Sequence, residues 1–176
     1  AKMGNNSDFG KAALDLGHVI AKNSWRLVYG AGGIGLMGAV AEGAQLSGAK
    51  TFGVIPEHLA QHELGKRDLD QFIVTDDMHS RKKLMFMNSD AVVLLPGGAG
   101  SMDEFFEVLT WAQLKLHSRP IIVANISGYW QPMLNLINHT IASGFADPSI
   151  RELFSIAQTV GEIETTLRSA LNTATV

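Results

Sequence analysis

Hydrophobic and polar positions divide the chain into short apolar runs that alternate with longer stretches of helical periodicity. The apolar runs predict strands at 25–29, 51–55, 71–75, 90–95, 120–125 and 153–157. Apolar residues spaced by three and four predict a first helix that Ser7 or Asp8 caps. They predict further helices at 36–46, 78–88, 101–116, 129–143 and 162–171. This alternation favours an α/β fold: a doubly wound, Rossmann-like parallel sheet with helices on both faces.

The 176 residues are expected to form a single domain, 1–176, which is long enough to bury a core. Residues 57–70 are polar and predict an irregular segment. Because the first predicted element is a helix, we expect that the strand preceding it in such a fold is missing from this sequence. Ligands bind beyond the carboxyl ends of the strands in open parallel sheets, and two glycine turns fall there.

The second glycine turn carries the strongest signal for a ligand. Pro96 ends an apolar strand, and Gly97, Gly98 and Gly100 allow the backbone to approach a ligand closely. A strand, a glycine turn and a new helix N-terminus, with Ser101 as the predicted cap, together favour an anion, most often a phosphate. Two carboxylates follow at 103 and 104, in the predicted first turn, where they favour the helix dipole.

For Asp103 the dipole interpretation is the simpler one. Glu104 needs another explanation, because a second carboxylate beside a phosphate is repulsive unless it faces something else.

The first glycine turn matches G-x-G-x-x-G at Gly30, Gly32 and Gly35, between a predicted strand and a predicted helix. This is the dinucleotide fingerprint, and Glu57 lies about where its ribose-binding acid is expected. We interpret the turn, including Gly32 and Gly33, as part of a mononucleotide pocket shared with the second turn. The alternative is that these glycines serve only tight strand-to-helix packing.

A basic segment, Met78-His-Ser-Arg-Lys82, precedes the central strand. Arg81 offers a planar fork of donors that suits a phosphate or a leaving base, whereas Lys82 is a compact point charge. Such runs are also common on solvated helix faces, which is the interpretation for Lys83 and an open alternative for Arg81. His79 is interpreted as structural. His58 and His62 lack a third ligand, so no metal site is expected.

Composition narrows the class of protein. The net charge of −3 argues against nucleic acid and anionic lipid as partners. The absence of cysteine excludes disulfides, thiolate metal sites and cysteine nucleophiles. No signal peptide and no membrane-spanning run are indicated, so a cytoplasmic location is expected. Trp111, Met85 and Met87 are interpreted as core or dimer contacts.

Two motifs in the correct order resemble those of the Lonely Guy (LOG) family of cytokinin riboside 5′-monophosphate phosphoribohydrolases, many of which carry the label "lysine decarboxylase". Residues 96–104 resemble the family's P-G-G-x-G-T-x-x-E signature, with Ser101 in place of the threonine, and residues 78–82 resemble M-H-x-R-K. Further similarity lies at 27–38, 53–56, 109–114 and 128–130. Only residues 1–4 match the family's opening turn, which would weaken part of the nucleotide pocket.

The resemblance implies hydrolysis of the N-glycosidic bond of a nucleoside 5′-monophosphate to a free base and ribose 5-phosphate, without a cofactor. It implies Glu104 and Arg81 as the catalytic residues. It implies a substrate site that comprises Met78, Lys82, Glu63, Gly32, Gly33, Gly97, Gly98, Gly100, Ser101 and Asp103. It further implies a homodimer or a larger homo-oligomer. The choice between adenine and an N6-prenylated adenine as the base stays open.

Two other functions remain as alternatives. A carrier of the same fold would bind a nucleotide or phosphate-bearing cofactor without hydrolysis, and a dehydrogenase would bind NAD at Gly30–Gly35. A decarboxylase is disfavoured, because it would usually need pyridoxal phosphate on a Schiff-base lysine, and Lys82 is the only lysine near the inferred pocket.

Overall fold

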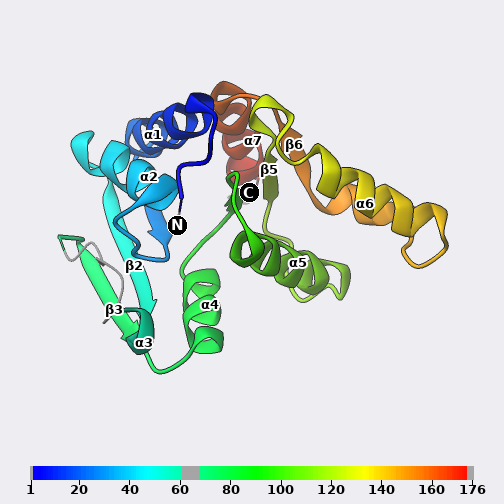
Figure 1. The fold of residues 1–176 in the computed structure, drawn as a ribbon, viewed down its shortest axis with the longest axis horizontal. Coiled ribbons are helices and arrows are strands. Elements are labelled where there is room, and N and C mark those ends of the chain that lie inside the picture. Colours follow the sequence, from blue (N-terminus) through cyan, green and yellow to red (C-terminus); the bar gives the residue numbers. More distant parts are fainter. Residues whose placement is uncertain (1, 61–67, 174–176) are drawn as a thin grey trace. The chain divides into compact units, whose positions relative to one another are not determined.

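The computed structural model describes residues 2–60 and 68–173, and its contacts divide the chain into two compact units (Figure 1). Unit 1 is Ala1–Ser89 and unit 2 is Asp90–Val176. Each unit holds one three-stranded parallel sheet, β1-β2-β3 in unit 1 and β4-β5-β6 in unit 2. The prediction of parallel strands alternating with helices is confirmed.

Unit 1 follows the predicted order of elements. They are α1 (Ser7–Lys22), β1 (Arg26–Tyr29), α2 (Gly35–Leu46), β2 (Lys50–Pro56), α3 (Glu57–Ala60), β3 (Gln71–Thr75) and α4 (Met78–Met87). The central strand is β2, which is buried from Thr51 to Pro56. The short helix α3 was not predicted, since it lies in a polar stretch that shows no apolar periodicity.

Two helices of unit 1, α1 and α2, lie side by side (Figure 1). Their backbones approach so closely that a Cβ on Gly17 would overlap the Val40 carbonyl of α2. Likewise, a Cβ on Gly43 would overlap the Leu14 carbonyl of α1. The cap of α1 is Asn6, whose side chain accepts from the Asp8 N–H at 2.9 Å, so the prediction of Ser7 or Asp8 as the cap is wrong.

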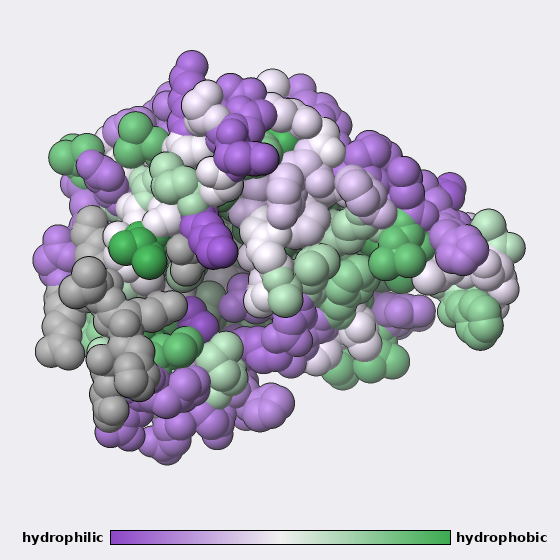
Figure 2. All heavy atoms as spheres, viewed as in Figure 1, coloured by the Kyte–Doolittle hydropathy of each residue, from purple (hydrophilic) through white to green (hydrophobic). Residues whose placement is uncertain are grey.

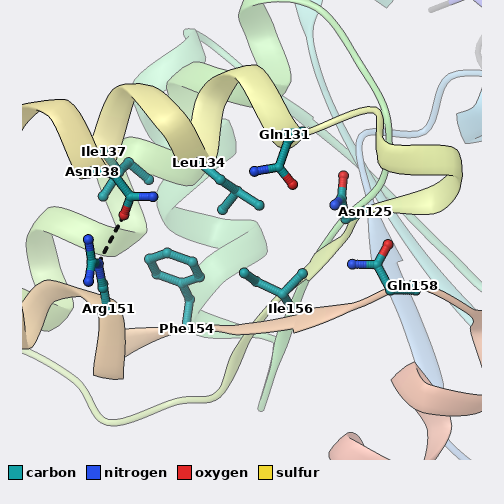
Figure 3. A pocket seen from close by; sticks show the side chains of 9 residues that line it. All are labelled: Asn125, Gln131, Leu134, Ile137, Asn138, Arg151, Phe154, Ile156 and Gln158. Carbon is teal, nitrogen blue, oxygen red and sulfur yellow. Dashed lines mark hydrogen bonds between the residues drawn. The ribbon is translucent and has the colours of Figure 1, made fainter.

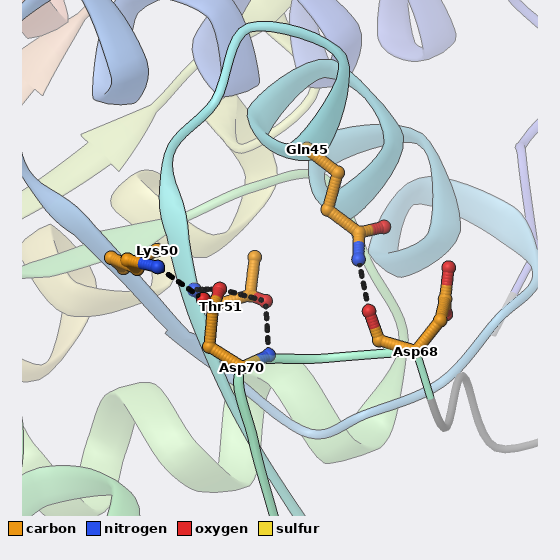
Figure 4. Close-up of polar contacts among 5 residues, drawn as sticks. All are labelled: Gln45, Lys50, Thr51, Asp68 and Asp70. Carbon is orange, nitrogen blue, oxygen red and sulfur yellow. Dashed lines mark hydrogen bonds and ion pairs between the residues drawn. The ribbon is translucent and has the colours of Figure 1, made fainter.

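A small polar network ties the start of β3 to β2 (Figure 4). The Asp70 carboxylate accepts from the Lys50 ammonium at 2.7 Å and from the Thr51 N–H at 2.9 Å. Both hydrogen bonds lower the pKa of Asp70 from its usual value of 3.8, and the one from Lys50 contributes most. Beside them, the Gln45 side chain donates to the Asp68 carbonyl at 2.7 Å. The residues that lead into β3 are thereby fixed to α2 and β2.

Unit 2 comprises β4 (Val92–Leu94), α5 (Ala99–Gln113), β5 (Ile121–Ala124), the 3₁₀ helix η1 (Ile126–Gly128), α6 (Gln131–Ala142), the 3₁₀ helix η2 (Pro148–Leu153), β6 (Ser155–Ala157) and α7 (Val160–Thr173). Its central strand β5 is buried at all four positions, as expected for a parallel strand covered on both faces. The 3₁₀ helix η2 was not predicted; it begins at Pro148, and Asp147 caps it by accepting from the Ser149 N–H at 2.9 Å.

The start of α5 differs from the prediction. The helix begins at Ala99 with Gly98 as its N-cap residue, so the prediction that Ser101 caps it is wrong. Asp103 and Glu104 consequently lie in the second turn of the helix, not in the first. Within the described part of the chain, no helix is long and apolar enough to cross a bilayer.

Candidate active site

The second glycine turn connects β4 to α5 at the carboxyl end of its strand. No side chain of the described residues caps α5, and its first helical hydrogen bond runs from the Met102 N–H to the Gly98 carbonyl at 3.1 Å. The N–H groups of Ala99, Gly100 and Ser101 therefore precede the helical ladder and have no acceptor within the helix. Such N–H groups, at the positive end of the helix dipole, are the usual donors to a bound phosphate.

Space at this turn differs from one glycine to the next. A Cβ on Gly98 or on Gly100 would meet no atom within 4 Å, so both residues border open space. A Cβ on Gly97 would instead overlap the Ser101 side chain, which means that the Ser101 hydroxyl lies against the turn. The structure thus brings Gly97 and Ser101 together and leaves the other two glycines accessible.

Tyr129, which directly follows η1, is hydrogen-bonded to the turn. Its hydroxyl donates to the Gly97 carbonyl at 2.7 Å, and its ring packs edge-on against Trp130, with ring centroids 4.9 Å apart. This contact was not predicted, although Gly128-Tyr-Trp130 is one of the segments that resemble the LOG family. Spacing alone could not reveal it, because 32 positions separate the tyrosine from the turn.

Two carboxylates follow the turn on α5. Asp103 is exposed and Glu104 is half-buried. The helix dipole acts mainly within the first turn, so their place in the second turn removes most of the support for a dipole role of Asp103. Glu104 lies nearer the protein interior, where a carboxylate interacts with its surroundings more strongly than in bulk water.

In unit 1, Arg81 is the buried residue of α4, with 7% of its surface exposed. Its Nε donates to the Val54 carbonyl of β2 at 3.1 Å, and its Nη2 donates to the Gly30 carbonyl, directly after β1, at 3.1 Å. Its Nη1 donates to the Met78 sulfur at 3.7 Å. The guanidinium therefore lies at the carboxyl ends of two neighbouring parallel strands, the edge where ligands bind in such sheets.

The partners of this guanidinium are neutral. Among the residues that the structure describes, no carboxylate forms an ion pair with Arg81. Three of the five N–H donors of an arginine are used by the three contacts above, which leaves two for another group. Because arginine cannot lose its charge, a buried guanidinium with neutral partners is suited to receive an anion.

The start of α4 determines where Arg81 lies. Asp77 is the N-cap residue, and its carboxylate accepts from the Ser80 N–H at 2.7 Å. This hydrogen bond holds the pKa of Asp77 below its usual range. Met78 opens the helix and its sulfur accepts from Arg81, whereas Lys82 is half-buried.

The first glycine turn has contacts with other parts of unit 1 at both of its ends. Gly32 is buried and Gly33 is exposed. The Leu36 N–H of α2 donates to the Lys2 carbonyl at 3.3 Å, and a Cβ on Gly38 would lie within 2.8 Å of the Gly33 carbonyl carbon. The alternative interpretation, a glycine that serves packing, therefore describes Gly30, where a Cβ would overlap Arg81.

The remaining predicted positions are distributed as follows. Glu57 is exposed at the start of α3, after β2. Glu63 and His62 lie outside the described residues. Among the described residues, no three histidine, aspartate or glutamate side chains are grouped as metal ligands.

Unit 2 also has a pocket of about 420 Å³ between α6 and β6 (Figure 3). Amide side chains lie at one end, Arg151 and Asn138 lie at the other, and apolar side chains line the middle. Its lining comprises Asn125, Gln131, Leu134, Ile137, Asn138, Arg151, Phe154, Ile156 and Gln158. None of the predicted site residues lines this pocket, so it is separate from the glycine turn.

The chain is similar to known proteins over most of its length. A family model described as "possible lysine decarboxylase" matches residues 37–167. The probable cytokinin riboside 5′-monophosphate phosphoribohydrolase LOG4 of Oryza sativa subsp. japonica is 38% identical, over 97% of this chain and 74% of the relative. The cytokinin riboside 5′-monophosphate phosphoribohydrolase of Rhodococcoides fascians is 39% identical, over 96% of this chain and 86% of the relative.

Solved structures share the fold. The molybdenum cofactor carrier protein MCP of Chlamydomonas reinhardtii has a TM-score of 0.73 at 23% identity, over 97% of this chain and 92% of that chain. At this identity the likeness concerns the fold alone. The family match and the identities above show that this chain belongs to the Lonely Guy (LOG) family, that of the cytokinin riboside 5′-monophosphate phosphoribohydrolases.

Proposed function

We propose that this protein hydrolyses the N-glycosidic bond of an adenosine 5′-monophosphate, plain or N6-prenylated. The products are the free base and ribose 5-phosphate. The observation that carries the proposal is the buried guanidinium of Arg81, which has neutral partners among the described residues and lies at the carboxyl ends of β1 and β2. A fixed cation at that edge suits a reaction that places negative charge on a leaving group.

The phosphate is assigned to the second glycine turn. The N–H groups of Ala99, Gly100 and Ser101 are free of helical partners, and Gly98 and Gly100 border open space. The Ser101 hydroxyl adds a donor beside them. Gly97, Gly32, Gly33, Met78, Lys82, Glu63 and Asp103 complete the proposed substrate site on the basis of the family motifs.

In the proposed reaction, water forms a bond to C1′ of the ribose while the bond between C1′ and the base nitrogen breaks. The bonding electrons leave with the base, which takes up a proton. Glycosidic cleavage passes through an oxocarbenium-like state, which the Glu104 carboxylate stabilises, and the same carboxylate accepts a proton from the attacking water. Arg81 stabilises the charge on the departing base electrostatically, because an arginine is a poor proton donor at neutral pH.

The proposal uses Arg81 of unit 1 and Glu104 of unit 2, so it treats residues 1–176 as one functional domain. It needs neither metal nor organic cofactor. We also propose a cytoplasmic location; a chain without cysteine forms no disulfide and is compatible with a reducing compartment.

The direct test is incubation with AMP, with isopentenyladenosine 5′-monophosphate and with the two matching nucleosides, followed by chromatography of the free base. Base released from the monophosphates but not from the nucleosides would support the proposal and would rank the two bases. If neither monophosphate released base, the proposal would be wrong.

Glu104→Gln separates catalysis from binding. We expect kcat to fall about 10²- to 10³-fold with little change in thermal stability, because the amide keeps the shape but loses the charge. Glu107→Gln, a neighbouring half-buried glutamate of α5, is the matched control and should keep its activity. Unchanged turnover in Glu104→Gln would exclude the carboxylate from the reaction.

A second candidate is a carrier that binds a nucleotide-like cofactor without hydrolysis. It is favoured by the fold shared with the molybdenum cofactor carrier protein of Chlamydomonas reinhardtii. For a carrier, calorimetry would detect AMP binding while chromatography would detect no free base. Glu104→Gln would leave that binding unchanged.

We further propose that the protein is a homodimer, joined through the apolar side chains of α5 and of the segment that follows it. Phe106, Leu114 and Leu116 are 36%, 63% and 69% exposed, and hydrophobic residues lie among hydrophilic ones over this region in Figure 2. Apolar residues exposed together are typical of contacts between protein chains. Light scattering coupled to gel filtration measures the mass, and a monomer would contradict the proposal.

A further inference from the structure

Gly30 lies where the guanidinium of Arg81 needs room. A Cβ on Gly30 would overlap Nη2 of Arg81 and would lie 3.0 Å from Cζ, while Met37 Sδ would be 3.3 Å away. The same Nη2 donates to the Gly30 carbonyl at 3.1 Å. The guanidinium thus packs directly on the Gly30 backbone. Resting on the proposed function, we propose that Gly30 is a positioning residue for Arg81.

Backbone conformation does not explain why residue 30 is glycine. The glycines with left-handed φ values in the described chain include Gly35, at +62°, but not Gly30. An alanine could therefore adopt the backbone angles of residue 30 without strain. The contact with Arg81 is what excludes a side chain there, apart from the flexible end of Met37, which can move.

This contact gives the first glycine of G-x-G-x-x-G a different role from the one that its motif suggests. In a dinucleotide-binding turn that glycine serves the tight turn next to the pyrophosphate. Here it admits a side chain from α4, which is 51 positions away in the sequence. The glycine, the Val54 carbonyl and the Met78 sulfur together fix the direction of the remaining N–H donors of Arg81.

Gly30→Ala should displace the guanidinium without removing its charge. We expect kcat for AMP to fall roughly 10- to 100-fold, as for a misplaced catalytic group, while KM changes less than about threefold. Gly161→Ala is the matched control, because Gly161 is exposed in α7 and the nearest atom to its Cβ would be 3.9 Å away. That variant should keep wild-type kinetics.

A double-mutant cycle in thermal stability tests the contact itself. Gly30→Ala should lower Tm in the wild type but have little effect in an Arg81→Ala background, where the guanidinium is gone. The cycle stays informative even if the Gly30→Ala protein folds poorly. Adding Arg81→Ala should then restore folding, because the side chain that the alanine overlaps is gone. Equal destabilisation in both backgrounds would overturn the proposal.

A ¹⁵N NMR spectrum of the arginine side chains adds a readout that does not depend on activity. The Nε–H of Arg81, bonded to a buried carbonyl, should give a slowly exchanging signal that disappears in Arg81→Ala. It should shift in Gly30→Ala and stay unchanged in Gly161→Ala. If the wild type releases no base, the proposed function is wrong. The Arg81 Nε–H signal then still shows whether Gly30 determines the position of the guanidinium. An unmoved signal with unchanged kcat would show that Gly30 does not position Arg81.

Discussion

The two glycine turns look alike in sequence but differ in what surrounds them. At the first turn, between β1 and α2, Arg81 packs on Gly30, the Lys2 carbonyl accepts from the Leu36 N–H, and the Gly33 carbonyl lies where a Cβ on Gly38 would be. The second turn, between β4 and α5, leaves open space at its later glycines and free N–H groups at the start of its helix.

This difference shows that a glycine pattern can serve two physical purposes. A glycine can make room for another part of the protein, or it can make room for a ligand. The sequence alone does not separate these purposes, because both need a residue without a side chain. The atoms around the absent Cβ do separate them, and they assign Gly30 of the first turn to packing.

The strongest test substitutes one glycine near the start of each helix. Gly38→Ala should destabilise the fold by roughly 1–3 kcal/mol, since its Cβ would overlap the backbone of Gly33. Gly100→Ala should leave Tm unchanged or slightly higher, because its Cβ meets open space and alanine favours a helix. The same change should raise KM for AMP about tenfold by obstructing the N–H groups.

Thermal denaturation and steady-state kinetics on both variants measure the contrast. The comparison would fail if Gly100→Ala destabilised the protein as much as Gly38→Ala, or if it bound AMP as well as the wild type.

A smaller effect is expected at Tyr129, which supports the second turn from outside. Tyr129→Phe removes the hydrogen bond to the Gly97 carbonyl and keeps the ring contact with Trp130. Because water can replace the lost donor at this exposed position, we expect KM for AMP to rise about two- to fivefold with little change in Tm. The matching nucleoside should bind equally to both proteins, and a loss of nucleoside binding would contradict a role at the phosphate turn.

The smallest change in Tm is expected for a substitution of Asp70, which lies in unit 1, the unit that contains the first turn. The folded state lowers the pKa of Asp70, so this group stabilises the fold above its unfolded value of 3.8, and the contribution is lost as the pH falls through the lowered pKa. Asp70→Asn should therefore reduce Tm slightly at neutral pH, and the difference from the wild type should vanish in acid.

Thermal melts from pH 7 to pH 2 follow this difference, with Asp76→Asn as the control for an exposed carboxylate. Turnover should stay unchanged. A difference in Tm that persisted in acid would mean that the charge of Asp70 is not what stabilises the start of β3.

Much of the fold follows from local pattern. Buried runs such as Ile121–Ala124 and the apolar face of α1 predict their own elements, because their periods match strand and helix geometry. The start of α5 was harder to predict, because a serine is a better cap than a glycine by preference and the turn itself determined the outcome.

The candidate site was predictable as a set of residues but not as a geometry. Arg81 could equally have been a solvated cation, and in the fold it donates to the Gly30 carbonyl, directly after β1, and to the Val54 carbonyl of β2, 51 and 27 positions away. The roles of Gly30 beside Arg81 and of Tyr129 beside Gly97 follow only from such distant contacts. Long-range contacts of this kind leave no periodic trace in the chain.

The uncapped start of α5 has a practical consequence for work with this protein. If the phosphate of the substrate completes the hydrogen bonding of that helix, inorganic phosphate can do the same in its place. A phosphate buffer would then act as a ligand that raises the apparent Tm and competes with AMP, so melting curves and inhibition constants should be compared only in phosphate-free buffers such as HEPES.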